Sequence, residues 1–584
     1  MIAQLATGAL ALFQEHRYLD ASDIHLATKL AWLAGEKREL PILLAAFTSK
    51  ALQSGSACLD LGILREQIEA VSEDAVPLAD EAWPTAEEAL AAVEDSPLVV
   101  SQPHPLHLEG RLLYFERYWL VEREVHDRLK ALLQPRGCEP GGANLDSIAA
   151  ALAEIFGTDY EPQQRQAAAL AALSRLTVVT GGPGSGKTYT IARVLATLLA
   201  AEPELRVALA APTGKAAARV KESLVAAASS LPARHFERIE SLEAKTIHRL
   251  LGSKFGRFDN NASHPLPYDM VVIDEASMVA LPLMAALLEA LPPNGSLVLV
   301  GDPDQLTPVE AGAVLADIVE LPLEIPGLEP ALEKLSLEPS GALVHLPGNH
   351  RSGGTRIDEA ARAVQLFDAA GLEAALGDDV ILLEPGADAL AELQARVLES
   401  ALPMLQAGEA GDVDAALAAL KRHQLLCAHR EGPAGVAWWV RQVHTWIASV
   451  HRFNPSGFYP GEPLLYTVNS PDLGLFNGDT GVVVDMGGEL MACFPGREPL
   501  SVHLLSEVVN AFAMTVHKAQ GSQFSGVTLI LPPAGSPLLT HELLYTALTR
   551  AESSVVMYGE RESLLKAATT KAVRASGLGA KPKV

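Results

Sequence analysis

Cysteine is scarce in this sequence. The 584 residues include only Cys58, Cys138, Cys427 and Cys493, which lie far apart and form no CxxC or Cys/His pair. This spacing excludes a zinc ribbon, an iron–sulfur cluster and a disulfide framework. We therefore interpret all four as ordinary buried thiols.

Long hydrophobic runs are also lacking. The longest stretch without a charged residue, 519–541, contains glutamine, serine, glycine and the pair Pro532 and Pro533, which a membrane-spanning helix disfavours. The apolar run at the N-terminus has no basic segment before it and no cleavage site of the secretory kind. The sequence therefore predicts a cytoplasmic protein that does not enter a membrane.

Basic residues are few relative to acidic ones. The chain has 45 Lys and Arg against 71 Asp and Glu, a net charge of −26. This balance excludes a broad electrostatic attraction to nucleic acid, so any contact with DNA has to be local. Residues 51–100 hold eleven acidic side chains and one basic side chain, Arg65. That stretch either faces a basic protein partner or is a solvated acidic surface.

Length and composition indicate several domains. A chain of 584 residues with 49% hydrophobic residues is too long for one core and is typical of a helix-rich globular protein. We predict a helical N-terminal domain at 1–115, a first α/β domain at 116–335 and a second at 336–584. Within the second, a turn-rich stretch predicts a small β insertion at about 455–508.

Four short β-branched runs predict parallel strands in the first α/β domain. They are LTVVT (176–180), RVALAAP (206–212), MVVIDE (270–275) and SLVLVGD (296–302). Continuous apolar runs of this kind suit strands that helices cover on both faces, with functional residues at the carboxyl ends. We therefore expect the chemistry of this domain in the loops that follow these strands.

A glycine-rich loop follows the first of these runs. It reads GGPGSGKT and comprises Gly181, Gly182, Pro183, Gly184, Ser185, Gly186, Lys187 and Thr188. A strand before it and a helix after it favour a phosphate-binding loop, in which backbone N–H groups surround the phosphates of ATP. We predict that Lys187 reaches the terminal phosphates and that Thr188 holds Mg²⁺.

Two adjacent carboxylates, Asp274 and Glu275, end another of these strands. Phosphoryl transfer to water needs a carboxylate for Mg²⁺ and a group that orients the attacking water. We assign Asp274 to the metal and Glu275 to the water. Without the phosphate-binding loop, the same pair would be interpreted as a helix cap.

Six segments resemble the signature motifs of superfamily one helicases and follow the order of that family. They are APTGKAAAR (211–219), KTIHRLLG (245–252), GDPDQLTPVEAGAVL (301–315), LPGNHRS (346–352), AMTVHKAQGSQF (513–524) and YTALTRA (545–551). The resemblance implies an α/β fold with two RecA-like P-loop motor domains that hold ATP between them. It also implies that Gln305 senses the γ-phosphate and that Asp302 links the ATP site to a DNA groove.

The same resemblance implies roles for other residues. Arg351 and Arg550 would be arginine fingers from the second motor domain, which stabilise charge in phosphoryl transfer. Gln164 would read the adenine ring, with Gln163 and Gln166 as open alternatives. The residues implied to line the DNA groove are Thr213, Lys215, Thr246, His248, Thr515, His517 and Lys518. The two histidines are explained equally well as structural residues.

Within superfamily one, the chain resembles the RecD family, the alpha subunits of exodeoxyribonuclease V (RecBCD). The segments that carry this resemblance are LYFERYWLVEREV (113–125), LLCAHREGPAGV (425–436) and NSPDLGLFNGDTGVV (469–483). It implies a 5′–3′ DNA helicase of double-strand break repair and recombination, which acts on a single strand at a duplex end together with RecB-like and RecC-like subunits. It further implies that the N-terminal domain docks on the gamma subunit, that the insertion is SH3-like and that the nuclease lies in a partner chain.

Two alternatives stay open. The chain could be a stand-alone RecD-like helicase, although such relatives carry a long N-terminal region with helix-hairpin-helix units that is not recognisable here. It could also be a scaffold subunit whose ATP site only gates assembly, although every catalytic position of the motifs is filled.

Overall fold

The computed structural model describes residues 6–53, 55–72, 75–136, 143–157, 162–254, 256–307, 310–348 and 355–579. Two residues of the sequence analysis, Cys138 and Arg351, lie outside the described residues. Cys58, Cys427 and Cys493 are buried free thiols, as predicted. In the described part of the chain, no helix has the length and apolarity needed to cross a membrane.

A six-stranded parallel sheet forms the centre of the first half of the chain. In spatial order its strands are β11 (Leu343–His345), β4 (Leu176–Thr180), β10 (Ser296–Gly301), β9 (Met270–Ile273), β5 (Val207–Ala211) and β6 (Ala244–Thr246). Every residue of β4, β5, β9 and β10 is buried. The four apolar runs therefore form neighbouring central strands, as predicted from their continuous hydrophobicity.

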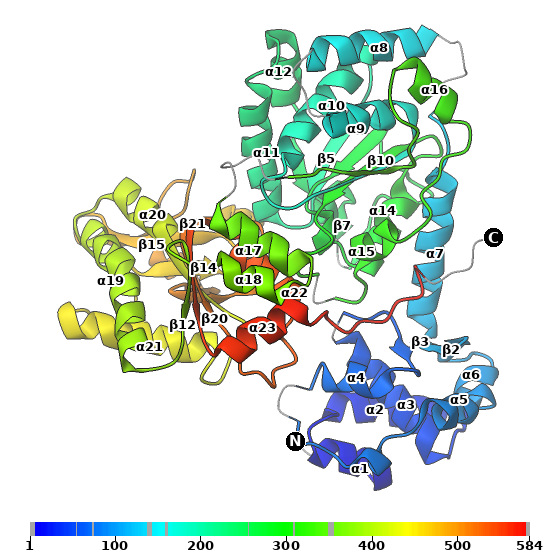
Figure 1. Ribbon diagram of the computed structural model, residues 1–584, viewed down its shortest axis with the longest axis horizontal. Coiled ribbons are helices and arrows are strands. Elements are labelled where there is room, and N and C mark those ends of the chain that lie inside the picture. The colour runs from blue at the N-terminus through cyan, green and yellow to red at the C-terminus, as the bar shows by residue number, and fades with distance from the viewer. Residues whose placement is uncertain are drawn as a thin grey trace.

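Helices cover both faces of this sheet (Figure 1). One side carries α8 (Ala143–Phe156), α9 (Pro162–Leu173), α10 (Lys187–Ala201), α11 (Gly214–Ala228) and α12 (Ala233–Glu240), and the other carries α7 (Glu116–Leu132), α14 (Leu281–Ala290) and α15 (Val314–Val319). The shorter elements are α13 (Ile247–Leu250), α16 (Glu329–Lys334) and the hairpin of β7 (Ser253–Lys254) and β8 (Arg257–Phe258). Because the strands are parallel, the loops after β4, β9 and β10 meet at one edge of the sheet.

A second parallel sheet, with five strands, lies in the C-terminal half. Its order is β12 (Val380–Leu383), β21 (Ala551–Tyr558), β20 (Phe524–Ile530), β13 (His423–Cys427) and β19 (Ala513–Thr515). One core packs it against α17 (Arg356–Gln365), α18 (Ala369–Ala375), α22 (His541–Leu548) and α23 (Arg561–Thr569), and another against α19 (Ala387–Glu409), α20 (Val413–Arg422) and α21 (Val436–Val450). The fold is thus α/β with two parallel sheets.

A small antiparallel sheet is inserted between β13 and β19. It contains β17 (Leu500–Ser501), β16 (Leu490–Cys493), β15 (Thr480–Asp485), β14 (Pro463–Tyr466) and β18 (Val508–Asn510), in that order. Leu464, Tyr466 and Val483 belong to its own hydrophobic core. These strands occupy the interval in which turn-rich sequence predicted a β insertion.

The N-terminal residues form a separate helical layer below the first sheet (Figure 1). Its helices are α1 (Gly8–Glu15), α2 (Ala21–Ala34), α3 (Glu39–Leu52), α4 (Leu64–Glu69), α5 (Ala86–Glu94) and α6 (Pro97–Val100). The sequence analysis did not anticipate the sheet of β1 (Leu59–Asp60), β3 (Leu112–Phe115) and β2 (Leu106–Glu109) that accompanies them. Each of these strands has at most four residues, too short for a period-two pattern to be recognised.

Residues 570–579, which we name the C-terminal strap, run from α23 back to α7 (Figure 1). The N–H of Ala57 donates to the carbonyl of Ala575 at 2.9 Å, and the N–H of Gly577 donates to Glu122 Oε2 at 3.3 Å. Leu578 is fully buried in the core of the first sheet. The strap therefore ties the N-terminal layer to the first α/β unit.

Asp317 of α15 is a half-buried carboxyl beneath the strap. Burial raises its pKa from 3.8 to about 7, and the charges of Glu122 and Glu320 act in the same direction. Ser576 and Arg574 of the strap act in the opposite direction without reversing the shift. Because the folded chain holds this proton more tightly than the unfolded chain, stability is lost as pH rises from about 4 to about 7.

We expect Asp317→Asn, which cannot ionise, to be more stable than the parent at pH 8 by about 2 kcal/mol, and this gain to be clearly smaller at pH 5 and to vanish below about pH 4. Urea unfolding at both pH values measures the difference. The exposed Asp378 provides a control, since Asp378→Asn should change nothing at either pH. An equal gain for Asp317→Asn at pH 5 and pH 8 would contradict the assignment.

Candidate functional site: a nucleotide cavity between two parallel sheets

The glycine-rich loop lies between β4 and α10 at the carboxyl edge of the first sheet. Gly184 and Gly186 have φ angles of +82° and +83°, a conformation that side chains disfavour. A Cβ at Gly181 would lie 2.5 Å from Ser185 Oγ, so this position is also restricted to glycine. The loop sequence is therefore dictated by a tight turn that ends at the N-terminus of α10, where the helix dipole favours an anion.

The side chain of Lys187 folds back over this loop. Its Nζ donates to the carbonyls of Gly181 at 2.6 Å and Gly182 at 2.9 Å. The Ser185 hydroxyl is buried and has no hydrogen-bond partner among the described residues. A cation and a donor that lacks a partner, both in one loop at a helix N-terminus, suit a phosphate group.

Two carboxylates stand at the ends of neighbouring strands. Asp274 follows β9 and is only 6% exposed, and Asp302 follows β10 and is fully buried. Burial, together with the charge of Glu275, raises the pKa of Asp274 to about 7, although Lys187 lowers it. Among the described residues Asp274 has no ion-pair partner, and it lines the same cavity as Thr188, so this desolvated carboxylate and that hydroxyl are fitting oxygen ligands for Mg²⁺.

The backbone of Glu275 adopts a left-handed conformation. Its φ is +53°, which costs energy for any residue other than glycine, and its N–H donates to Asp274 Oδ1 at 2.9 Å. This turn sends the two adjacent side chains in different directions. Both of them line the same cavity.

This cavity has a volume of about 370 Å³ and lies where the two parallel sheets face each other. The first sheet and its helices contribute Pro183, Gly184, Gly186, Lys187, Thr188, Asp274, Glu275 and Gln305, and the second contributes Gly521, Gln523 and Arg550. Six predicted catalytic or metal-binding residues thus meet in one place. Gly181, Gly182 and Ser185 belong to the loop but not to the lining of the cavity.

Arg550 approaches from the second sheet. It is 3% exposed and donates from Nε to the carbonyl of Thr546 at 3.1 Å and from a terminal nitrogen to Thr549 Oγ1 at 3.3 Å. Burial lowers the pKa of Arg550, while Glu275 opposes that shift. The guanidinium is therefore a buried cation in the cavity that Asp274 and Glu275 also line.

Hydrogen bonds between the loop after β10 and α22 join the two halves of the cavity. Tyr545 donates to Asp302 Oδ2 at 3.1 Å, and Gln305 Nε2 donates to the same oxygen at 2.9 Å. The N–H of Leu306 donates to Thr546 Oγ1 at 2.8 Å. The predicted γ-phosphate sensor, Gln305, is therefore hydrogen-bonded to the predicted linking residue, Asp302, which also accepts a hydrogen bond from α22.

The sequence analysis overlooked Arg219. This residue of α11 lines the cavity, donates to the carbonyl of Gly521 at 2.6 Å and also donates to Gln523. It is the last residue of the APTGKAAAR segment, so the motif contained a signal. Its partners are more than 300 residues away in the chain, which is why spacing alone did not reveal the role.

The predicted adenine contact, Gln164, is not in the lining of this cavity. Its side chain is buried on α9. Gln166 donates to the carbonyl of Glu338 at 3.2 Å and to Ser340 Oγ at 2.8 Å. The described contacts thus give Gln166 a structural role and leave the assignment of Gln164 as a prediction.

A larger cavity of about 1440 Å³ runs between the two sheets and the inserted β sheet. Its lining includes Thr213, Lys215, His248, Thr515, His517 and Lys518, six of the seven predicted groove residues; Thr246 is not among them. Lys215 Nζ donates to the carbonyl of Gly478 in the insertion at 3.0 Å. The insertion therefore closes one side of this groove.

Burial lowers the pKa values of basic side chains in the groove. It lowers the pKa of Lys215 to about 8 and that of His517 to about 4. His517 is thus neutral near pH 7, and it contributes hydrogen-bonding capacity rather than charge. The basic side chains of the lining, Lys215, Arg430 and Lys518, are matched by Glu310, Glu431 and Glu560, so the groove carries little net positive charge.

The three threonines predicted for the groove also cap helices. Thr213 accepts the N–H of Ala216 at the start of α11, and Thr246 accepts that of Arg249 at the start of α13. Thr515 caps a short 3₁₀ turn in the same way. Each hydroxyl is therefore committed as an acceptor to the backbone, while its own proton can be donated to another group.

The fold and this site define a helicase-like α/β protein with a phosphate-binding loop. Family models match at residues 15–114 (RecBCD enzyme subunit RecD, N-terminal domain), 164–311 (AAA domain) and 510–558 (UvrD-like helicase C-terminal domain). The RecBCD enzyme subunit RecD of Mycobacterium tuberculosis is 42% identical over 98% of this chain and 96% of its own length. The chain belongs to the RecD family.

More distant relatives extend this comparison. The ATP-dependent RecD2 DNA helicase of Deinococcus radiodurans is 32% identical over 78% of this chain and 56% of its own length. A solved structure of Pif1 helicases at forked double-stranded DNA has a TM-score of 0.38 at 16% identity, covering 70% of this chain and 94% of that one.

We expect Arg219→Gln to lower kcat of ATP hydrolysis by at least about tenfold, because it removes a half-buried cation and two hydrogen bonds across the cavity. Arg219→Lys should recover part of the rate, since it restores the charge. Arg206→Gln is the matched control: Arg206 pairs with Asp269 on the surface at the opposite edge of the same sheet. Unchanged steady-state hydrolysis by Arg219→Gln would contradict this role.

Proposed function

We propose that this chain is the ATP-dependent 5′–3′ DNA helicase subunit of a RecBCD-type helicase–nuclease that acts in the cytoplasm in double-strand break repair and recombination. Its partners would be RecB-like and RecC-like subunits and the single strand at a duplex end. The observation that carries this proposal is the cavity that combines Lys187, Asp274 and Glu275 with Arg550 of the other sheet. Membership of the RecD family supports the choice of assembly.

In this proposal the two parallel sheets are RecA-like motor domains, at 116–335 and 336–584, and ATP binds between them. Lys187 and the loop N–H groups hold the phosphates, and Gln305 lies against the γ-phosphate. Mg²⁺ bound to Thr188 and Asp274 would neutralise phosphate charge. Glu275 orients the attacking water, and Arg550, together with Arg351, stabilises the charge of the transferred group.

Movement would follow from closure of the cavity. Because Arg219 bonds across the cavity and Arg550 lines it from the opposite side, bound ATP draws the sheets together and product release lets them part. The loop after β10 transmits this change, since Leu306 also accepts a hydrogen bond from Gln520, which lines the groove. We propose that DNA lies in this groove, beneath an SH3-like insertion, and that the N-terminal domain at 1–115 docks on the RecC-like subunit.

Lys187→Gln should abolish DNA-stimulated ATP hydrolysis, because it removes the positive charge that Lys187 places on the terminal phosphates. The fold should stay intact, because the glutamine side chain still packs in the loop. Single-turnover hydrolysis with and without single-stranded DNA, together with circular dichroism, measures both effects. An assembled Lys187→Gln complex whose subunit still translocates 5′–3′ at the parent rate would contradict the proposal. Absence of DNA stimulation in the parent complex would instead favour a scaffold, and a free monomer that unwinds duplexes would favour a stand-alone helicase.

Lys518→Ala should weaken binding of single-stranded DNA and reduce the slope of log affinity against log salt by about 0.7, because one phosphate contact is lost. Fluorescence anisotropy between 50 and 200 mM salt measures the slope in the full complex. The exposed Lys421, at the far end of α20, provides the control, since Lys421→Ala should leave both quantities unchanged. Equal slopes for Lys518→Ala and the parent would place DNA elsewhere.

A further inference from the structure

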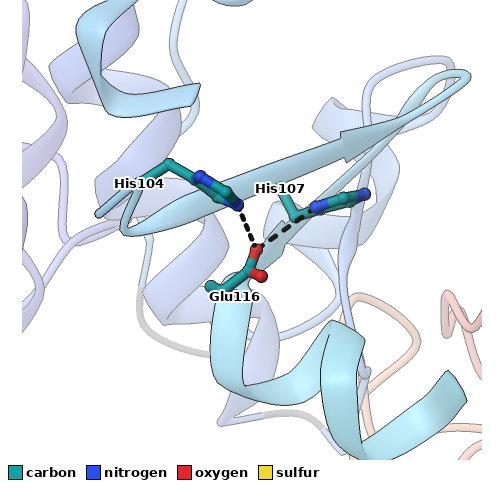
Figure 2. A group of neighbouring side chains, drawn as sticks. All are labelled: His104, His107 and Glu116. Carbon is teal, nitrogen blue, oxygen red and sulfur yellow. Dashed lines mark hydrogen bonds and ion pairs between the residues drawn. The ribbon is translucent and has the colours of Figure 1, made fainter. Parts of the chain in front are cut away.

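Two imidazoles and a carboxylate converge where the N-terminal layer meets α7. Figure 2 shows His104 in the segment before β2, His107 on β2 and Glu116 at the first turn of α7, with the carboxylate between the two rings. His104 Nε2 lies 3.0 Å from Glu116 Oε2, and His107 Nδ1 lies 3.2 Å from the same oxygen. One ligand atom from each residue lies within 4.8 Å of both others.

These separations match a metal-ligand set. Zinc binds imidazole nitrogen and carboxylate oxygen at about 2.0–2.1 Å in tetrahedral geometry, which places neighbouring ligand atoms roughly 3.3 Å apart. The two measured nitrogen–oxygen distances are within a few tenths of an ångström of that spacing. Small rotations of partly exposed rings would suffice to accommodate an ion.

The surrounding contacts hold the three ligands in position. The N–H of Glu116 donates to the carbonyl of Pro105 at 3.0 Å, which fixes the start of α7 against the segment between the two histidines. The His107 ring stacks on Trp119 with 3.7 Å between centroids, and Trp119 Nε1 donates to Glu109 at 2.8 Å. This support orients the ligands before any ion binds.

Access is compatible with binding from solution. The side chains of His104, His107 and Glu116 are 31%, 25% and 26% exposed, so one side of the cluster is open to solvent. Three protein ligands would leave a fourth position for water or for a group of another molecule. Two nitrogen ligands favour a transition metal over Mg²⁺, which prefers oxygen.

We propose that His104, His107 and Glu116 bind one zinc-type transition-metal ion, separate from the nucleotide cavity. The ion would fasten the β2–β3 hairpin to the first turn of α7. Since α7 packs against α14 of the first α/β unit, the ion would stiffen the connection between the N-terminal layer and that unit. The proposal does not depend on the helicase activity.

The test uses the full chain after removal of metals with a chelator. Isothermal titration with Zn²⁺ in the absence of nucleotide should show one equivalent bound at micromolar affinity or tighter, and Zn²⁺ should raise the melting temperature. His104→Ala and His107→Ala should each weaken binding at least tenfold and remove the thermal shift. His264→Ala, which removes an exposed histidine far from the cluster in sequence, should leave both unchanged.

Two further variants separate the possible outcomes. His104→Cys keeps a ligand, so it should retain one equivalent and give Co²⁺ a thiolate charge-transfer band. Asp274→Asn should leave Zn²⁺ binding intact, because that residue belongs to the nucleotide cavity. If the parent binds no Zn²⁺, or if the alanine variants bind it as tightly as the parent, the proposal is overturned and Glu116 is only a hydrogen-bond acceptor for two imidazoles.

Discussion

The structure depends on a buried set of hydrogen bonds between the loop after β10 and helix α22. Asp302 receives bonds from Tyr545 and Gln305, and Leu306 is bonded to Thr546. In a low-dielectric interior such bonds are strong when made and costly when broken, so they define how the two sheets meet. The nucleotide cavity and the groove both follow from that arrangement, because each is lined from both sides of the same contact.

The acidic composition is compatible with the proposed DNA groove, because acidic side chains in the lining of that groove balance its basic ones. Its lining combines threonine hydroxyls, a neutral His517 and lysines whose pKa values are lowered by burial. Such groups hold a strand by hydrogen bonds and shape more than by long-range attraction. We expect such a chain to gain little from nonspecific attraction to DNA, which suits a subunit better than an independent enzyme.

Sequence reasoning identified those features that local pattern determines. The apolar runs became β4, β5, β9 and β10, and because parallel strands share an edge, Lys187, Asp274 and Gln305 came together as predicted. Features that depend on tertiary docking were missed. The hydrogen-bond partners of Arg219, Gly521 and Gln523, lie in the second half of the chain, so its role depends on how the two halves pack. The short N-terminal strands form only because they pair with one another. Arg351 lies outside the described residues, so its role as a second finger stays a prediction.

The C-terminal strap carries a consequence for biosynthesis. Ala575 bonds to Ser56 across a separation of 519 residues, and Leu578 completes a core begun by α7. At about 5–20 residues per second, a ribosome needs roughly half a minute to two minutes to make the intervening chain. Throughout that interval the surface around Tyr114 and Glu122 is uncovered on the nascent polypeptide. Chaperones or an assembling subunit therefore have a defined period in which to bind it before the chain closes over itself.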